Sequence, residues 1–373
     1  MLNRAFWQRR RVFLTGHTGF KGSWLSIWLQ ELGAEVTGYA LNPPTQPNLF
    51  ELAKAAAGIQ SIHGDIRNFS QLKAALAGCR PEVVIHMAAQ SVVRRGYEDP
   101  IETYSSNVMG TVHLLEALRQ LKQPCAVVNV TTDKCYENHE WVWGYRENEP
   151  MGGRDPYANS KGCAELVTSA YRESFFPTAS FQEHGVALAT ARAGNVVGGG
   201  DWTSDQLVPD LVTAFLSERS CLIRNPSAVR PWQFVLEPLR GYLMLAERLK
   251  DDPARFACGW NFGPAESDTK PVRWIADKLA QLWGGEASWT PDSGVHPHED
   301  HYLKLDISKA AALLDWHPLL PLAEALEWTV QWYRAFEAKK DPRDVIKTQL
   351  KRYQEISQPE LVSNFQSFVS DLE

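Results

Sequence analysis

Residues 11–22 read RVFLTGHTGFKG, an apolar run that passes directly into a loop with three evenly spaced glycines. The apolar run predicts a buried strand, and residues 22–32 predict the helix that follows it. Glycine has no side chain, so the backbone of such a loop can approach a pyrophosphate, whose charge the helix N-terminus stabilises. A glycine pattern alone is a weak signal, but strand, loop and helix in this order predict a dinucleotide-binding unit.

Apolar runs and amphipathic stretches continue to alternate after this unit. Strands are predicted at residues 11–15, 35–41, 59–63, 82–87, 126–131 and 186–191, and helices at 22–32, 71–77, 101–121 and 156–174. Strands that are apolar throughout must be covered on both faces, which indicates a parallel sheet between two helix layers. The predicted fold class is therefore α/β, a Rossmann-type doubly wound parallel sheet with a smaller C-terminal α/β substrate lobe.

The alternation breaks near residue 190. Short strands, glycine-rich turns and isolated helices at residues 272–283 and 322–336 are typical of a smaller α/β lobe. We therefore expect a Rossmann domain over residues 1–190 and a substrate lobe over most of 191–373, with some of that chain returning to the first domain. The charged tail after Lys339 receives no assigned function.

Composition excludes several classes of protein. No apolar stretch approaches the roughly 20 residues that a membrane span needs, and the net charge of −6 argues against a long nucleic-acid surface. The six cysteines contain no Cys-x-x-Cys pair, which favours a reduced cytoplasmic protein without a zinc site. Residues 296–301 hold three histidines, but prolines there suggest a surface loop, and we predict no metal.

The cofactor is predicted from the ends of the second and third strands. The acid that usually binds the ribose at the end of the second strand is missing. Asn42 lies near that position, and its side-chain amide could donate or accept one hydrogen bond instead. No arginine is present there to hold a 2′-phosphate, which favours NAD over NADP. Asp65, after the third strand, could accept a hydrogen bond from the adenine amine, or it could simply cap a helix.

Tyr157 and Lys161 form the one Tyr-x-x-x-Lys pair in the sequence, and they fall on one face of the predicted helix 156–174. A phenol is a poor base at neutral pH, and a nearby lysine cation favours the phenolate. Tyr157 could then accept the proton of a substrate hydroxyl while a hydride leaves the same carbon. The pair predicts an oxidation in which tyrosine is the base.

These motifs together resemble the extended short-chain dehydrogenase/reductase family, over about residues 10 to 336. The stretches that carry the resemblance are the glycine loop, MAAQ (87–90), NVMGT (107–111), TTD (131–133), the Tyr157–Lys161 pair and WHP (316–318). The cofactor-binding residues that it implies are Gly16, Thr18, Gly19, Phe20, Lys21, Gly22, Asn42, Asp65, Ile66, Ala88, Ala89, Gln90, Asn107, Thr131, Tyr157 and Lys161. It also implies that Thr132 shares the substrate proton with Tyr157.

Within that family, sugar-nucleotide 4,6-dehydratases usually carry Thr-Asp-Glu where this chain has Thr132-Asp133-Lys134. The sequence Thr132-Asp133-Lys134, together with the stretches 145–147 and 230–233, resembles that of the family members that act on CDP-linked glucose. The resemblance implies oxidation at C4, removal of the C5 proton by Lys134 and protonation of the C6 hydroxyl by Asp133. A structural salt bridge between Asp133 and Lys134 is the alternative interpretation.

The same resemblance implies Ser91, Arg94 and Asn195 as substrate-binding residues, and guanidinium groups suit phosphates, which adds Arg224 and Arg230. It also implies that helices 101–121 and 156–174 pair with a second copy, in a homodimer or homotetramer. Three other functions stay open: a nucleotide-sugar 4-epimerase, a dehydratase of another nucleotide hexose, and a non-catalytic sensor of the cofactor.

Overall fold

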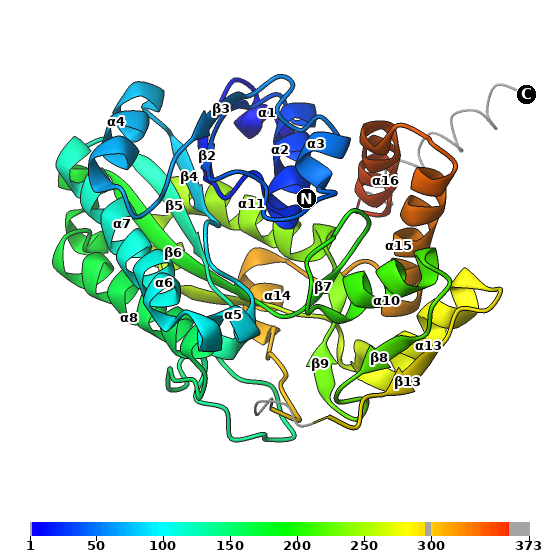
Figure 1. Cartoon of the computed structure of the whole chain (residues 1–373). Coiled ribbons are helices and arrows are strands. Elements are labelled where there is room, and N and C mark those ends of the chain that lie inside the picture. Colours follow the sequence, from blue (N-terminus) through cyan, green and yellow to red (C-terminus); the bar gives the residue numbers. More distant parts are fainter. Residues whose placement is uncertain (1, 295–299, 358–373) are drawn as a thin grey trace, which may run out of the picture.

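The computed structural model describes residues 2–294 and 300–357 and has a central parallel sheet with strand order β11-β6-β5-β4-β1-β2-β3 (Figure 1). The strands are β1 (Arg11–Thr15), β2 (Glu35–Ala40), β3 (Gln60–His63), β4 (Val83–His86), β5 (Cys125–Val130), β6 (Val186–Ala193) and β11 (Gly259–Phe262). The predicted α/β fold is confirmed. The order reverses at β1, which pairs with both β2 and β4, so a crevice opens at the carboxyl ends of these strands.

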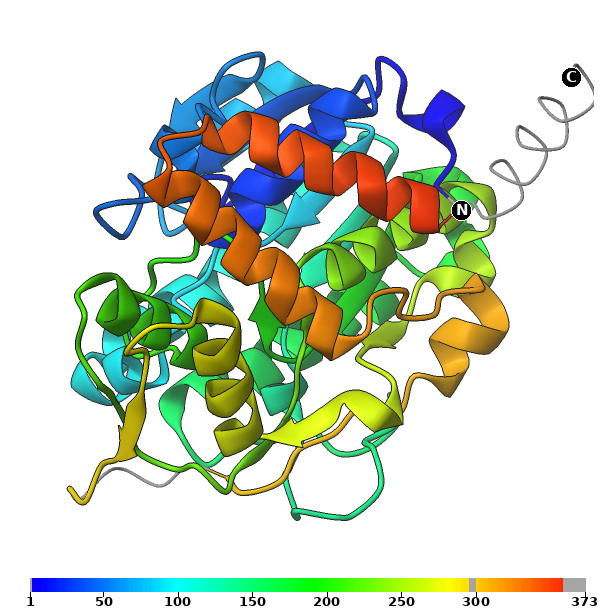
Figure 2. The same cartoon turned by 90° about the vertical axis from the view of Figure 1, so that its right-hand side faces the viewer.

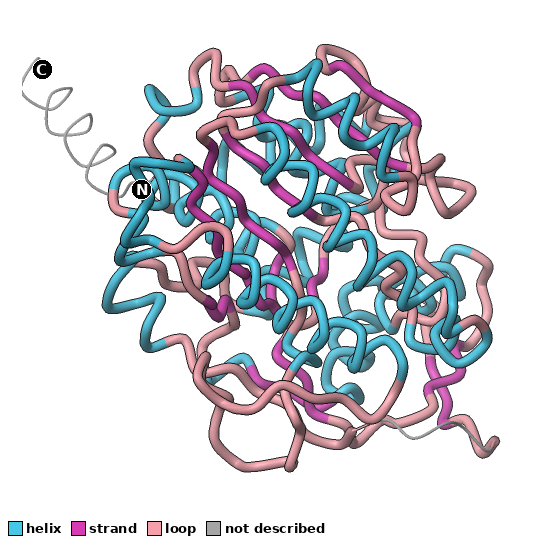
Figure 3. The backbone as a smooth tube through the Cα atoms, turned by 90° about the vertical axis from the view of Figure 1, so that its left-hand side faces the viewer, coloured by secondary structure: helices cyan, strands magenta, loops and turns pink. Residues whose placement is uncertain are grey.

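Helices cover both faces of the sheet, and this explains why the strands are apolar throughout. One layer consists of α4 (Phe69–Cys79), α7 (Gly110–Leu121) and α8 (Pro156–Ser174); the other contains α2 (Phe20–Glu31), α11 (Leu236–Asp251) and α16 (Pro342–Ile356) (Figures 1 and 3). Successive side chains of a strand point to opposite faces. Val12 and Leu14 accordingly join one hydrophobic core, whereas Phe13 joins the other.

The predicted helix 101–121 is divided into three parts. These are α6 (Pro100–Tyr104), a π-helical turn η1 (Ser105–Met109) and α7. Asp99 caps α6 by accepting from the backbone N of Glu102 at 2.8 Å. The wider turn brings Asn107 inward, where it is buried, and π-turns often mark functional sites.

Short elements build the lobe beside the carboxyl edge of the sheet. They are β7 (Val196–Val197), α10 (Leu207–Leu216), β8 (Cys221–Ile223), β9 (Val229–Pro231), β10 (Gln233–Phe234), β12 (Thr269–Pro271), α13 (Val272–Trp283) and β13 (Trp289–Pro291). The remaining helices are α1 (Arg4–Trp7), α3 (Leu49–Leu52), α5 (Val93–Glu98), η2 (Asp133–Cys135), η3 (Thr178–Ser180), α9 (Phe181–His184), α12 (Pro253–Phe256), η4 (Glu266–Asp268), α14 (Ser308–Leu314) and α15 (Leu322–Glu337). Within the described residues, no helix is both long and apolar enough to cross a membrane.

The chain beyond residue 190 returns to the sheet three times. Strand β11 pairs with β6, α11 packs against β5 and β6, and α16 packs beside α2 (Figure 2). The charged tail contains a helix that sequence analysis did not predict. Its apolar face is narrow, since Ile346, Leu350 and Tyr353 are buried among many charged residues. The division at residue 190 stays a prediction.

The contact of α16 with α11 can be tested at Tyr353. Its hydroxyl donates to Glu237 Oε2 at 2.7 Å in a buried site. Tyr353→Phe leaves that carboxylate short of a donor, so we expect the free energy of unfolding to fall by about 1–3 kcal/mol. Tyr171→Phe is the control, because its hydroxyl lies 3.4 Å from Glu116 in a partly exposed site. Equal losses for the two variants in urea unfolding would contradict the assignment.

Candidate active site

The glycine loop joins β1 to α2 and leaves the start of the helix open. Gly16 has a φ of +74°, and an added Cβ would lie 2.8 Å from the backbone N of Ala88. A Cβ at Gly22 would lie 2.1 Å from the Gly16 carbonyl oxygen, so both positions require glycine. At Gly19 the nearest atom would be 3.5 Å away, and no side chain caps α2. The free N–H groups and open space fit a pyrophosphate.

Two polar side chains hold the ends of β1 and β4 together around this crevice. Thr15 Oγ1 accepts from the backbone N of Met87 and of Ala88, each at 3.0 Å. Asn107 binds the backbone of Gln90 on both sides, accepting from its N and donating to its O at 2.9 Å. It also donates to Ser160 Oγ at 2.9 Å. The predicted cofactor residue Asn107 therefore fixes the segment that contains Ala88, Ala89 and Gln90.

The residues predicted to hold the adenosine half of the cofactor lie at the ends of β2 and β3. Thr18 Oγ1 donates to the Leu41 carbonyl at 2.9 Å, and Asn42 beside it is exposed. Hydrogen bonds from Arg67 lower the pKa of Asp65, and the two side chains pair at 2.6 Å. Ile66 is buried in the core. An adenine amine would have to share Asp65 with Arg67, so this role stays a prediction.

Tyr157 and Lys161 project from α8, whose predicted bounds match the structure, and they are 8% and 7% exposed. Thr132 lies just after β5, and hydrogen bonding by its side chain acts to lower the pKa of Tyr157. Burial raises the pKa of Tyr157, and Lys161 Nζ donates to the Val130 carbonyl at 3.2 Å, so the expected lowering of the Tyr157 pKa by Lys161 stays a prediction. Burial, followed by the charge of Lys21, lowers the pKa of Lys161 to about 8.

Asp133 is the most buried acid of the crevice, at 2% exposure. Its Oδ1 accepts from Thr132 Oγ1 at 2.9 Å, whereas Oδ2 is buried and has no partner among the described residues. Burial raises the pKa of Asp133, although Lys134, Thr132 and Arg230 oppose the shift. Within the described chain no ion pair joins the side chains of Asp133 and Lys134, although the charge of Lys134 acts to lower the pKa of Asp133. Lys134 instead lines the adjoining pocket.

A buried ion pair that sequence analysis missed supports this loop from behind. Arg192 Nη2 and Glu165 Oε2 are 2.8 Å apart, and both side chains are almost fully buried. Thr131 Oγ1 donates to Glu165 Oε1 at 2.5 Å. The hydroxyl of Thr131, a predicted cofactor residue, is therefore engaged with the frame of the site. No local pattern marks this pair, because its members lie on α8 and β6.

Lys21 lies in the first turn of α2, and its charge acts on Asp133 and Lys161. Burial lowers its pKa to about 8, while Asp133 and Asp201 oppose the shift. Lys21 in turn lowers the pKa of Lys161. Phe20 beside it begins α2 and packs against the core. The sequence placed both residues in the cofactor loop; the closeness of Lys21 to Asp133 depends on the folded crevice.

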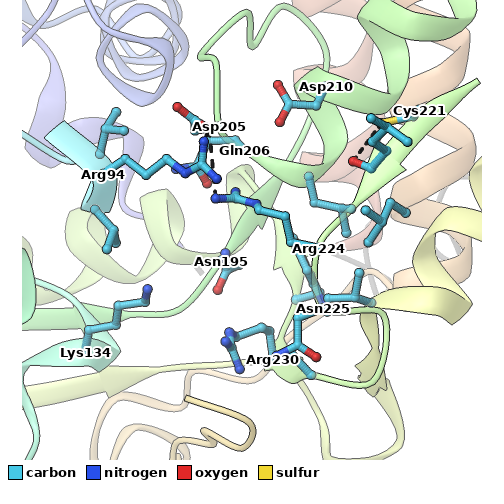
Figure 4. Close-up of a pocket in the computed structure, with 18 residues that line it drawn as sticks. Arg94, Lys134, Asn195, Asp205, Gln206, Asp210, Cys221, Arg224, Asn225 and Arg230 are labelled. Atoms are coloured by element: carbon cyan, nitrogen blue, oxygen red, sulfur yellow. Dashed lines mark hydrogen bonds and ion pairs between the residues drawn. The ribbon is translucent and has the colours of Figure 1, made fainter. Parts of the chain in front are cut away.

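A pocket between the sheet and the lobe brings together four of the five predicted substrate residues (Figure 4). Arg94, Asn195, Arg224 and Arg230 line it together with Lys134. Ser91 is exposed and is not among the lining residues, although Val92, Val93 and Arg94 are. The lining also contains Asp205 and Asp210, which sequence analysis missed.

Asp205 lies between two arginines of this pocket. It pairs with Arg94 at 3.2 Å and with Arg224 at 4.0 Å. The three residues are far apart in the sequence, so only the fold brings them together. Arg230 is 6% exposed and donates from Nη1 to the Val229 carbonyl at 3.0 Å. The pocket thus presents three guanidinium groups, which suit a diphosphate.

Residues 2–294 and 300–357 contain no group of three or more histidines, cysteines or acids that could hold a metal ion. Residues 296–299 of the histidine-rich stretch lie outside the described residues. All six cysteines are free thiols.

Comparisons with known proteins agree with this geometry. The family model described as GDP-mannose 4,6 dehydratase matches residues 13–329. CDP-glucose 4,6-dehydratase of Salmonella typhimurium is 59% identical over 336 residues, which cover 90% of this chain and 94% of that protein.

Two solved structures share the fold. The dTDP-glucose 4,6-dehydratase DesIV of Streptomyces venezuelae, with NAD bound, has a TM-score of 0.75 at 24% identity, covering 89% of this chain and 99% of that one. UDP-glucose 4-epimerase of Thermus thermophilus, also with NAD, has a TM-score of 0.74 at 24% identity, covering 87% and 99%. The chain belongs to the GDP-mannose 4,6 dehydratase family, within the extended short-chain dehydrogenases/reductases.

Proposed function

We propose that the chain is an NAD-dependent hydro-lyase that converts CDP-D-glucose to CDP-4-keto-6-deoxy-D-glucose and water. The observation that carries the proposal is the buried Asp133 carboxyl, whose Oδ2 has no partner in the described part of the chain and whose pKa is raised by burial. An epimerase needs no acid at this place, whereas loss of a hydroxyl as water does. The relative of 59% identity, named for CDP-glucose, supports the choice of substrate.

The residues of the crevice fit NAD. The open N-terminus of α2 and Gly19 would hold the pyrophosphate, and the segment from Ala88 to Gln90 would border the cofactor at the end of β4. NAD supplies the hydride acceptor for C4 of the sugar and the hydride donor for C6. No arginine stands beside Asn42, which supports NAD over NADP.

Tyr157 and Thr132 carry the proton transfer of the oxidation. The Tyr157 phenolate receives the proton of the C4 hydroxyl, and the Thr132 side chain, which acts to lower the pKa of Tyr157, supports that proton path. Because burial raises the pKa of Tyr157, the phenolate needs a cationic neighbour. Lys161, one helical turn away, is the protein cation placed to serve, through a movement of Nζ away from Val130.

Lys134 and Asp133 carry the elimination. A ketone at C4 acidifies the neighbouring C5–H, so a base at Lys134 can take that proton. The proton of Asp133 passes to the C6 hydroxyl, which leaves as water. Lys134 then returns a proton to C5 when C6 is reduced. Asp133 is buried and Lys134 reaches the pocket, so the two groups can serve adjacent carbons.

The proposal is tested by incubating the protein and NAD with CDP-, dTDP-, GDP- and UDP-glucose. We expect a 4-keto product that has lost one water, formed fastest from CDP-glucose. A product of unchanged mass would indicate epimerisation and overturn the dehydratase assignment. A preference for another nucleotide would leave the chemistry standing and overturn the choice of substrate.

Variants of the same reaction separate oxidation from elimination. Tyr157→Phe lacks the proton acceptor, so turnover should fall by about two orders of magnitude or more with normal NAD binding. Asp133→Asn and Lys134→Met should still oxidise C4, accumulating NADH absorbance and some 4-keto-hexose that retains its water. Loss of NADH formation in either variant, with fold and cofactor binding intact, would place that residue in oxidation or docking.

The cost of burying Asp133 should appear in the pH dependence of stability. Its folded pKa is raised above the unfolded value, so the folded state binds the extra proton. The Asp133 carboxyl should therefore contribute a loss of stability as pH rises above about 4, and this contribution is absent from Asp133→Asn. We expect the melting temperature of Asp133→Asn to exceed that of the wild type by a margin that grows as the pH rises above about 4.

Asp306 provides the control of opposite sign. Hydrogen bonds from Ser308 and Arg146 outweigh burial there and lower its pKa, so Asp306→Asn should lose stability that the wild type has above about pH 4. A margin for Asp133→Asn that is constant with pH would show that its carboxyl is not held protonated by the fold.

Two copies are proposed to associate through α6, η1 and α8. Large apolar side chains are exposed there, among them Ile101 at 79%, Leu166 at 60% and Met109 at 47%. Two such helical faces can pair as a four-helix contact. We expect a dimer or tetramer by light scattering at micromolar concentration, and dissociation of this contact in Ile101→Glu/Leu166→Glu. Val142→Glu changes a similarly exposed residue elsewhere and should leave the assembly intact. A monomeric wild type would contradict the proposed association.

A further inference from the structure

The residues that line the pocket suggest where the sugar, the diphosphate and the base of a nucleotide sugar would lie along it. Figure 4 shows Lys134 at one end and Asp210 with Cys221 at the other, with Asn195 and Arg224 between them. If Lys134 acts on the sugar, the diphosphate lies against the guanidinium groups beyond it. The nucleobase then reaches the end formed by α10 and β8.

We propose that Asp210 selects the nucleobase, by accepting a hydrogen bond from an exocyclic amine at position 4 of a pyrimidine. The proposal rests on the proposed function, because the direction of the pocket is taken from the role of Lys134. It deepens that function by naming the side chain that favours a cytidine nucleotide over a uridine or thymidine nucleotide.

The hydrogen-bonding groups of the bases explain why a carboxylate would favour cytosine over uracil or thymine. Cytosine carries an amine at position 4, which donates, whereas uracil and thymine carry a carbonyl oxygen there, which accepts. An ionised carboxylate has acceptor sites and no donor. A carboxylate at this end of the pocket therefore binds the amine and repels the carbonyl oxygen.

Asp210 has an acceptor site to offer at neutral pH. Burial and the neighbouring charge of Asp205 raise its pKa to about 6, while Arg224, the backbone of Asp205 and Arg94 oppose the shift. The carboxylate form therefore predominates at pH 7. Asp210 also lies in the first turn of α10, where the helix dipole favours negative charge.

Leu222 supplies an exposed apolar side chain to the lining of the same pocket. It lies on β8, lines the pocket and is 65% exposed, although its neighbours Cys221 and Ile223 are buried. A planar base can cover such a side chain while its edge faces Asp210. The pocket thus combines an apolar side chain on β8 with a carboxylate acceptor on α10, and ligand pockets typically pair apolar surface with a few polar groups.

Asp205 offers the matched comparison. It is also a carboxylate of this pocket, but it pairs with Arg94 at 3.2 Å and with Arg224 at 4.0 Å. Asp205 therefore contacts the two arginines that are assigned to the diphosphate, and all nucleotide sugars have a diphosphate. Its removal should change the affinity for different nucleotides by a common factor.

The test measures binding of CDP and of UDP to the protein with NAD by calorimetry, together with turnover of CDP-glucose and UDP-glucose. An amide at position 210 can donate as well as accept, so Asp210→Asn should lower the CDP-to-UDP ratio of affinities by about tenfold. Asp210→Ala should weaken CDP and strengthen or spare UDP. Asp205→Asn should shift both nucleotides and keep their ratio. Thermal unfolding checks that each variant is folded.

The outcomes distinguish this inference from the function on which it rests. An unchanged ratio in folded Asp210→Asn, or a ratio that collapses in Asp205→Asn instead, overturns the role of Asp210 while the wild type still dehydrates CDP-glucose. Equal binding of CDP and UDP by the wild type overturns it as well. A wild type that forms no 4-keto product from any nucleotide glucose overturns the proposed function itself.

Discussion

The buried Glu165–Arg192 pair is the interaction on which the site depends. Burial alone would raise the pKa of Glu165, but Arg192 and the hydroxyls of Thr131 and Thr190 lower it, so the carboxylate is kept ionised. Arg192 also donates to the Tyr136 hydroxyl at 2.7 Å, which donates in turn to Asn261 Oδ1. The network joins α8 to β5, β6 and β11. Breaking one side of such a pair leaves an uncompensated buried charge, so these elements are held in one arrangement.

The rigid network around Glu165 and Arg192 allows the crevice to hold groups whose ionisation is unfavourable. Lys21 and Lys161 are both buried with lowered pKa values, Tyr157 has a raised one, and Asp133 keeps an oxygen without a partner. Each of these departures disfavours the charged form of a group, and perturbed groups gather at functional sites. The contrast with Glu165 is instructive, because a similarly buried acid has all its lone pairs engaged there.

Local patterns predicted the parts of the site that are continuous in sequence. The glycine loop, the bounds of α8 and the Tyr157–Lys161 spacing follow from short-range rules, and the structure agrees. Strand β11 is four residues long and α16 is mostly polar, so neither gives a strong periodic signal. The Asp205 contacts with Arg94 and Arg224 depend on the tertiary fold. The lowering of the Tyr157 pKa by Lys161 stays a prediction, because burial raises that pKa and Lys161 Nζ bonds the Val130 carbonyl.

Four successive residues at the end of β5 face four different surroundings. Thr131 donates to Glu165, Thr132 contacts Tyr157 and Asp133, Asp133 is buried, and Lys134 lines the pocket. The strand ends at Val130 and a 3₁₀ turn begins at Asp133, so the backbone changes direction within these residues. A hydroxyl held by Glu165, a hydroxyl beside Tyr157, a buried carboxyl and a pocket-lining amine thereby follow one another at one strand end. Because only Lys134 among these four residues lines the pocket, a glutamate at position 134 would change the charge in the pocket and leave Thr132, Asp133 and Tyr157 in place.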